Sequence, residues 1–125
     1  MISKKTVLEM CRLFGTHPED IRAVIGPGIG YDSFQVGEEV ALTFKKSGFP
    51  VDRIWSFRGA RKEGSMEGGH HIDLKECVRC SLAECGVSEE NISVSEIDTY
   101  IDGRFYSARR EGISCGRNIN AIMLI

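Results

Sequence analysis

The chain has 125 residues, of which 42% are hydrophobic and 27% charged, and it carries a formal net charge of -2 at pH 7. This length suits a single unit with one core, spanning residues 1–125, and the composition excludes wholesale disorder. The weakly acidic balance argues against a nucleic-acid partner, and no apolar run approaches the roughly 20 residues that a membrane-spanning helix needs.

The spacing of apolar residues predicts helices that alternate with strands. Apolar side chains recur every three or four residues in the helical stretches, and Gly15 and Gly86 stand where two of the helices would end. Such alternation indicates an α/β fold, with a mixed sheet and helices packed on it. In chain order we expect a helix over residues 4–14, a strand over 21–25, a helix over 36–47, a strand end at 70–72, a helix over 73–85, a strand over 92–97 and a buried strand over 119–125.

Two segments have no helical or strand periodicity. Residues 49–69 contain four glycines and mixed charges, which predicts a long loop, and loops of this length are often functional or mobile. Residues 26–30 contain three glycines, so the backbone there bends tightly or approaches another group closely. This segment is not a dinucleotide-binding fingerprint, because its spacing differs and Pro27 lacks the N–H that a phosphate would use.

Five cysteines, an odd number, follow an N-terminus without a signal-peptide apolar core. This pattern is typical of reduced thiols and of a cytoplasmic protein. The spacing of Cys77, Cys80 and Cys85 invites a zinc site. At about 100° per residue, however, Cys80 and Cys85 point roughly 140° apart on a helix, so the three thiolates cannot close on one ion. Cys77 and Cys85 fit the buried face instead, as small apolar side chains.

His70 and His71, followed by Asp73, form a second candidate ligand set. Asp73 is better used as the N-cap of the third predicted helix, with Glu76 three residues later in a capping-box arrangement. A structural or surface role is therefore the favoured interpretation for both histidines. We expect no metal ligand and no complete catalytic site in this chain.

The segment over residues 102–117 concentrates side chains that bind anions. Guanidinium groups present planar forks to phosphate or carboxylate groups. A solvated or salt-bridged surface loop is the alternative interpretation, and composition alone favours it. The arginine, tyrosine and serine residues of this glycine-containing stretch are Arg104, Tyr106, Ser107, Arg109, Arg110, Ser114 and Arg117.

Several of these stretches together resemble one bacterial family, labelled multicopper polyphenol oxidase (laccase-type), purine nucleoside phosphorylase or peptidoglycan-editing factor. The resemblance implies that Arg109, Arg110 and Arg117, with Ser107, include the anion-binding part of a substrate pocket. Because neighbours in an extended segment point to opposite sides, we expect one of Arg109 and Arg110 to enter the pocket and the other to be structural. The matching stretches span nearly the whole chain, at residues 25–29, 34–40, 71–75, 84–87, 105–112 and 116–117.

For an intact enzyme the resemblance implies zinc-dependent phosphorolysis of purine nucleosides (adenosine, inosine or methylthioadenosine), with deamination of adenosine as a second activity. Its partners would be a purine nucleoside and phosphate, and copper enters only through the family label. Family members are longer, and their zinc ligands, two histidines and a cysteine, lie upstream of the position of Met1. We therefore expect a C-terminal fragment, an incomplete part of a larger α/β domain, that binds no cofactor alone.

Two alternatives remain at this point. The chain could be a stand-alone binding or assembly module, or a degenerate paralogue without activity; it could also be a metal-free enzyme that uses Asp32, Ser33 and the arginines. Many family members have cysteines in place of Asp32 and Ser33, and another in place of Asp98. Residues 23–25 and 119–125 are apolar on both faces, so missing layers would leave apolar surface open, and we expect self-association.

Overall fold

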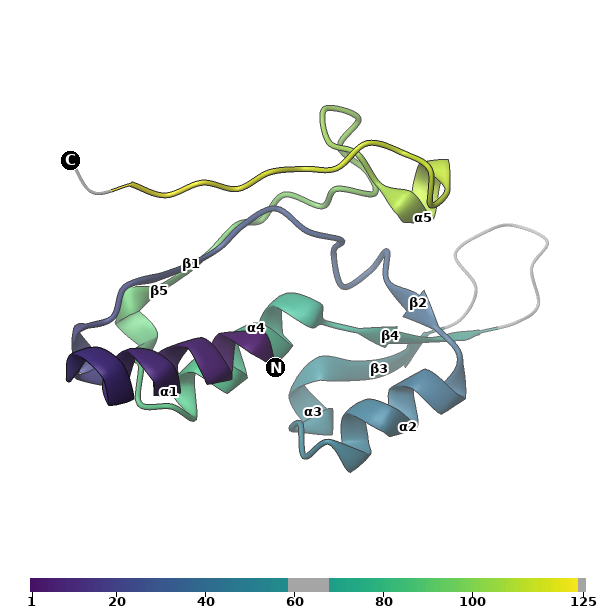
Figure 1. The fold of residues 1–125 in the computed structure, drawn as a ribbon. Helices are drawn as coiled ribbons and strands as arrows, with labels where there is room; N and C mark the ends of the chain where they lie inside the picture. The colour runs from purple at the N-terminus through teal and green to yellow at the C-terminus, as the bar shows by residue number, and fades with distance from the viewer. Residues whose placement is uncertain (59–67, 124–125) are drawn as a thin grey trace.

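The computed structural model describes residues 1–58 and 68–123 of the chain (Figure 1). None of the helices in these two ranges is both long and apolar enough to cross a membrane. The elements are α1 (Ile2–Phe14), β1 (Ala23–Ile25), β2 (Gln35–Val36), α2 (Glu38–Lys46), α3 (Val51–Ile54), β3 (Trp55–Arg58), β4 (Gly69–Ile72), α4 (Leu74–Ala83), β5 (Ile92–Val94) and α5 (Ala108–Glu111), with single 3-10 turns at Pro18–Asp20 and Glu89–Asn91.

The strands form two small sheets, one toward each end of α4 (Figure 1). β1 and β5 pair in parallel. β4 lies between β2 and β3 and is antiparallel to both, with Val36 opposite His70 in one pair and Trp55 opposite Ile72 in the other. One parallel and one antiparallel sheet, with helices packed against them, confirm the predicted mixed α/β fold.

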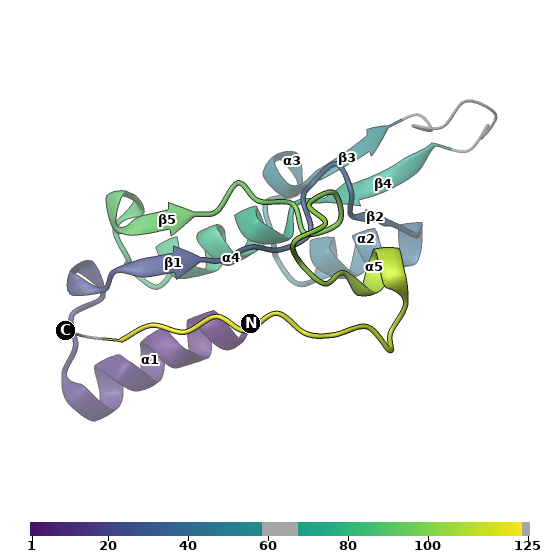
Figure 2. The ribbon, with the colours of Figure 1, turned by 90° about the horizontal axis from the view of Figure 1, so that it is seen from above.

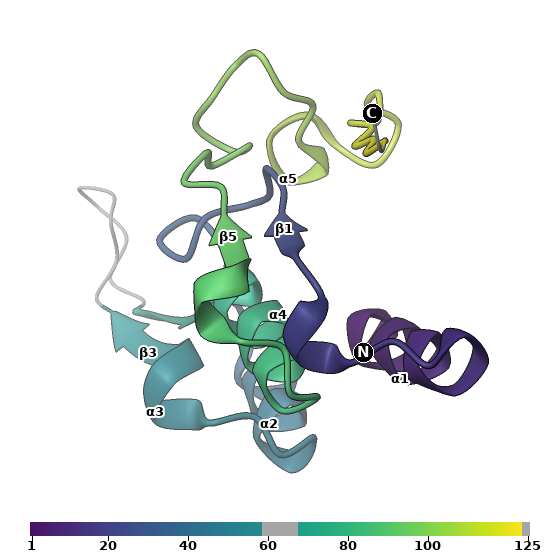
Figure 3. The ribbon, with the colours of Figure 1, turned by 90° about the vertical axis from the view of Figure 1, so that its left-hand side faces the viewer.

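α4 contributes to both apolar clusters of the fold, and Figure 3 shows it beneath β1 and β5. Because a helix turns about 100° per residue, Cys77 and Leu82 point to different sides of α4, and each side is buried. One cluster joins α1, α4 and β5; the other joins α2, α3, β4 and α4. The buried members are Val7, Leu82, Val87 and Ile92 in the first, and Ala41, Ile54, Ile72 and Cys77 in the second.

The start of α4 confirms the predicted cap, since the Asp73 carboxylate accepts a hydrogen bond from the Glu76 N–H at 2.9 Å. Asp73→Ala should lower the free energy of unfolding by about 1 kcal/mol, because the N–H then loses its partner. Thermal melts with and without a chelator measure this, and the chelator should change nothing. Loss of a bound metal without loss of stability would contradict the assignment of Asp73 as a cap.

The predicted loop over residues 49–69 is wrong at residues 51–58, where α3 passes directly into β3. Residues 59–67 of that prediction lie outside the described part of the chain. Ile54, at the end of α3, is fully buried in the same cluster as Ile72. A four-residue helix followed by a four-residue strand contains no repeat that the spacing of apolar residues can reveal.

Other predicted boundaries also differ from the structure. α2 begins at Glu38, not at residue 36, because Val36 pairs with His70 in the sheet. β1 and β5 cover only three residues each of the stretches predicted over 21–25 and 92–97. A strand of three residues is too short for its ends to be found from the pattern of apolar residues. The spacing therefore locates β1 and β5 but not their ends.

The C-terminal segment is extended but exposed, and the buried strand predicted over 119–125 is wrong as far as residue 123; the last two residues lie outside the described part. Ile119 and Ile122 are 91% and 89% exposed. No described strand pairs with this segment, and its apolar side chains remain exposed. Seen from above, it runs between β1 and α1 (Figure 2), and Asn120 lies against Gly26.

Candidate functional site

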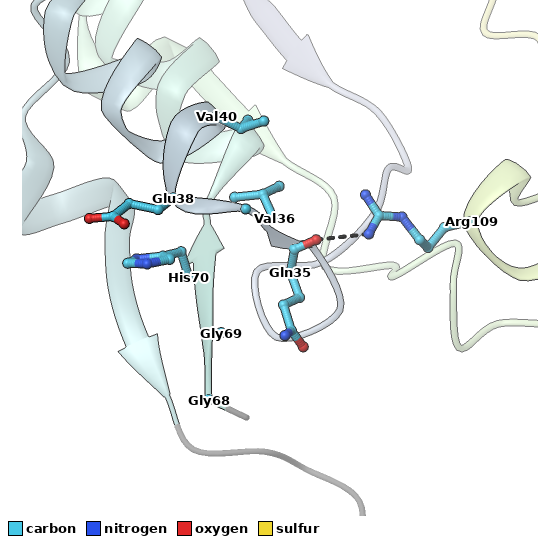
Figure 4. Close-up of a pocket in the computed structure, with 9 residues that line it drawn as sticks. Gln35, Val36, Glu38, Val40, Gly68, Gly69, His70 and Arg109 are labelled. Carbon is cyan, nitrogen blue, oxygen red and sulfur yellow. Dashed lines mark hydrogen bonds between the residues drawn. The ribbon is translucent and has the colours of Figure 1, made fainter. Parts of the chain in front are cut away.

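An open groove of about 650 Å³ lies where β2, β4, the start of α2 and α5 meet (Figure 4). The pairing of β2 with β4 brings His70 beside Val36, and α5 approaches from a distant part of the sequence. A concave surface with a few convergent polar groups is typical of small-molecule sites. The described lining consists of Gln35, Val36, Gly37, Glu38, Val40, Gly68, Gly69, His70 and Arg109.

Arg109 reaches the groove from α5. Its Nη1 donates a hydrogen bond to the carbonyl oxygen of Gln35 at 2.8 Å (Figure 4), and its guanidinium lies 5.2 Å from the centre of the Phe34 ring. Within the described residues this is its one hydrogen bond, although a guanidinium carries five N–H donors. The side chain is therefore anchored on one edge and retains donors for an anion on the other.

Arg110 binds a different part of the chain. Its guanidinium donates to the carbonyl oxygens of Thr99 at 3.0 Å, Tyr100 at 2.8 Å and Phe105 at 2.6 Å, and it forms an ion pair with Glu111. These contacts fasten the loop over residues 99–105 to α5. The adjacent arginines thus contact different parts of the chain, and they lie on a helical turn, not in the extended segment that the sequence suggested.

Arg117 and Ser107 lie close to Arg109 in the sequence, but they are not part of the described lining of the groove. Arg117 donates to the carbonyl oxygens of Cys115 at 2.5 Å and Ile113 at 2.9 Å, which closes the turn after α5. Ser107 is buried at the N-cap of α5, where its carbonyl oxygen accepts from the Glu111 N–H at 2.8 Å. Of the four predicted site residues, Arg109 is the one that belongs to the described lining of the groove.

Three groove residues were missed as site residues by sequence reasoning, namely Gln35, Glu38 and His70. The sequence offered His70 as a metal ligand and favoured a structural or surface role for it; in the structure its Nδ1 accepts a hydrogen bond from Trp55 Nε1 at 2.9 Å. The two-residue strand β2 has no sequence signal of its own, and only its pairing with β4 brings these side chains together.

Ser33 and Asp98, which are 65 residues apart in the sequence, meet in the structure. Ser33 donates to the Asp98 carboxylate at 2.5 Å. Burial raises the pKa of this carboxyl, but the hydrogen bonds from Ser33 and from the backbone of Gly30 and Tyr100, together with the charge of Lys75, hold it below its usual value. Asp98 is therefore an ionised anchor that joins the loop after β1 to the loop after β5.

Asp32 and Ser33 are also engaged within the fold. Asp32 forms an ion pair with Arg58, whose guanidinium lies 4.5 Å from the centre of the Tyr31 ring, and Ser33 binds Asp98. Neither Asp32 nor Ser33 belongs to the described lining of the groove. These contacts favour a structural role for both and weigh against a metal-free enzyme built on them.

The described residues do not fit a metal site, since no three His, Cys, Asp or Glu side chains among them gather where they could hold an ion. Cys77 is fully buried, and burial raises the pKa of its thiol to about 12. Burial also raises the pKa of Cys80. Because the thiolate and not the thiol binds zinc, these two cysteines are unsuited to it.

The comparisons with known proteins agree on one family. A family model described as "Multi-copper polyphenol oxidoreductase laccase" matches residues 1–125. A purine nucleoside phosphorylase from Bacteroides thetaiotaomicron is 44% identical over 124 residues, which is 98% of this chain and 44% of that protein. A protein from an unknown prokaryotic organism, "Adenosine deaminase RL5", is 38% identical over 122 residues, 97% of this chain and 44% of that protein.

Two crystal structures share the fold. The Bacillus licheniformis hypothetical protein YfiH is 32% identical with a TM-score of 0.75, covering 89% of this chain and 40% of that one. YlmD from Geobacillus stearothermophilus is 30% identical with a TM-score of 0.71, covering 88% of this chain and 39% of that one. The chain therefore spans less than half the length of the relatives and structures it matches.

Proposed function

Because the chain belongs to the multi-copper polyphenol oxidoreductase laccase family, we propose that it contributes the phosphate-binding part of a purine nucleoside phosphorylase. The observation that carries this proposal is the exposed guanidinium of Arg109 at a polar groove, in a family with relatives that bear this name. In phosphorolysis a phosphate oxygen forms a bond with the anomeric carbon of the ribose. The glycosidic C–N bond breaks, and the purine leaves with the bonding electrons.

The anchoring of the Arg109 guanidinium supports an anionic ligand at this side chain. Its guanidinium is oriented by the Gln35 carbonyl, so little side-chain freedom would be lost when an anion binds. A planar fork matches two phosphate oxygens at once. Glu38 lies on the other side of Val36 from Arg109 (Figure 4), and its carboxylate is an acceptor suited to ribose hydroxyls.

Arg110, Arg117 and Ser107 have positioning roles in this proposal. Arg110 and Arg117 donate hydrogen bonds to backbone carbonyl oxygens before and after α5, and Ser107 is the N-cap of that helix. They hold the turn from which Arg109 reaches the groove. Their part in phosphate binding would then be indirect, through the place and angle of α5.

The complete activity is proposed for a longer protein, since the chain spans 44% of the Bacteroides thetaiotaomicron relative. Zinc dependence belongs to that proposal as well. The described residues do not fit a zinc site, so we assign the metal to the part of the relatives that this chain does not span. Deamination of adenosine is a second candidate activity, supported by the name of one relative.

Arg109→Lys should weaken the binding of inorganic phosphate to the chain by about tenfold, because lysine keeps the charge but loses the bidentate fork. Titration calorimetry or amide chemical shifts would measure the affinity. The same change at the aligned position of the Bacteroides thetaiotaomicron relative should slow the phosphate-dependent release of free purine from adenosine or inosine.

Arg110→Lys is the matched control on the next residue. It breaks the contacts to the loop over 99–105, so it should lower the melting temperature and weaken phosphate binding less than Arg109→Lys, because its effect on the groove is only through the position of α5. Phosphate affinity that is identical in the wild type and Arg109→Lys would refute the assignment of this groove as a phosphate site.

A further inference from the structure

Three aromatic rings lie on one side of the sheet that contains β3 and β4. Residues that face each other in an antiparallel pair share a side of the sheet, and so do residues two apart on one strand. Phe57 pairs with His70, and Trp55 lies two residues before Phe57 on β3. The ring centre of His70 is 5.3 Å from that of Trp55 and 5.1 Å from that of Phe57. The three rings therefore form one aromatic surface.

A hollow of about 400 Å³ opens on this surface, between β3, β4 and α3. His70 borders both this hollow and the groove that contains Arg109. Its ring leans toward β3, however, and β2 lies between it and Arg109 (Figure 4). The two concave surfaces are therefore separate. The described lining of this second one, the aromatic hollow, is Val51, Asp52, Trp55, Ser56, Phe57 and His70.

Asp52 is the charged side chain of the aromatic hollow, and among the described residues its carboxylate has no hydrogen-bond or ion-pair partner. The Ser56 hydroxyl already accepts a hydrogen bond from Arg58 Nε at 3.0 Å. Trp55 Nε1 donates to His70 Nδ1 at 2.9 Å. Because an indole N–H can only donate, Nδ1 keeps its lone pair and this imidazole is uncharged. The described lining thus carries one negative charge and no positive one.

These features attract a positive charge. The face of an aromatic ring, and that of tryptophan most strongly, attracts a cation within about 6 Å of its centre, and a nearby carboxylate adds to the attraction. A primary ammonium needs acceptors for three N–H groups, and the free side-chain acceptor of the described lining is Asp52. An ammonium with four carbon substituents has no N–H to satisfy, so it loses less when aromatic groups replace the water around it.

We propose that the aromatic hollow binds a small organic cation with a fully alkylated ammonium group, which packs against Trp55 and Phe57 beside the Asp52 carboxylate. Phe57 is 65% exposed, so its ring is available to a ligand. The volume of about 400 Å³ lies at the small end of the range for ligand sites, which suits such a head group. The proposal does not rest on phosphate binding at Arg109, because the two ligands use different surfaces and carry opposite charges.

Choline is the probe, and Trp55 is the reporter, since it is the only tryptophan of the sequence. Titration with choline should change the Trp55 fluorescence and shift its indole N–H resonance in a saturable way. The neutral isostere 3,3-dimethylbutan-1-ol has the same shape without the charge and should bind at least about fivefold more weakly. Ethanolamine, which has the charge but not the methyl groups, should also bind more weakly than choline.

Two substitutions test the side chains of the aromatic hollow, each with a matched control elsewhere on the surface. Phe57→Leu should weaken choline binding by about fivefold, whereas Phe14→Leu, at a residue that is 78% exposed and outside the hollow, should not. Asp52→Asn should weaken it by roughly two- to fivefold at low ionic strength. Asp20→Asn, which removes the same charge from the turn at Pro18–Asp20, should not. Melting temperatures show whether the variants fold.

A titration without a saturable change in either signal overturns the proposal. Equal affinity for choline and its neutral isostere means apolar burial alone, and equal affinity for ethanolamine means an ion pair without the rings; either result overturns the proposed ligand class. If folded Phe57→Leu and Asp52→Asn bind choline like the wild type, the hollow is not the site. Arg109→Lys should leave choline binding unchanged, so failure of the phosphate site and failure of the aromatic hollow are seen separately.

Discussion

Ile72→Ala is expected to lower the free energy of unfolding by roughly 2–5 kcal/mol, the range for an isoleucine removed from a closed core. Ile72 is fully buried at the end of β4 and packs with Ala41, Ile54 and Cys77, so four elements meet on its side chain. The backbone around it is fixed by the bond from its N–H to the Phe34 carbonyl at 3.2 Å. Such a site cannot collapse easily, and most of the lost volume should remain as a cavity.

Urea unfolding followed by circular dichroism measures this loss, with Val24→Ala as the control. Val24 is also a β-branched residue on a short strand, but it is 70% exposed and should change stability by at most about 0.5 kcal/mol. Equal losses in the two variants would mean that the cluster around Ile72 is not a packed core. Because β4 also carries His70, a smaller core should loosen the groove, and phosphate affinity should fall together with stability.

Capping residues and glycines predicted the helices whose ends depend on neighbouring residues in the sequence. α1 ends at Gly15, which adopts a φ of 64°, a left-handed conformation that costs glycine little. α4 begins at Asp73, whose side chain caps it, and the helix is followed by Gly86 with a φ of 91°. In each case the deciding contact lies within a few residues, so spacing alone is sufficient to find it.

The site depends on contacts that spacing does not contain. β2 has two residues, and its pairing with β4 is what brings Gln35 and His70 to the same groove. Arg109 then reaches the Gln35 carbonyl across 74 residues of sequence. The sequence predicted that one of two adjacent arginines enters a pocket, but the choice between Arg109 and Arg110 follows from the angle of α5, which the 99–105 loop sets.

The buried strand predicted over residues 119–125 is wrong, as far as residue 123, for a related reason. Its apolar side chains fit a strand that is covered on both faces. An extended segment forms such a strand only when neighbouring strands pair with it. Within the described residues β1 pairs only with β5, and the segment over 119–123 pairs with no strand. An apolar groove of about 940 Å³ remains between α1, β1 and this segment, with Val24 and Ile122 as two of its exposed residues.

We therefore expect the chain to self-associate through this apolar groove. An open strand edge and a contiguous apolar surface both favour association in water. Val24 is 70% exposed and Ile122 is 89% exposed, and both line the groove. Burying one such side chain contributes roughly 1.5–3 kcal/mol, so placing a charge at both positions should weaken association by at least about tenfold.

Light scattering coupled to gel filtration would measure this for the wild type and for the double variant Val24→Lys, Ile122→Lys. The wild type should form oligomers and the double variant should be monomeric at the same concentration. Ile113→Lys is the control, because Ile113 is 87% exposed but does not line this groove, and it should associate like the wild type. If Ile113→Lys dissociates the oligomers equally, net charge and not the groove controls association; a wild type that is monomeric and unfolds cooperatively would instead identify an independent domain.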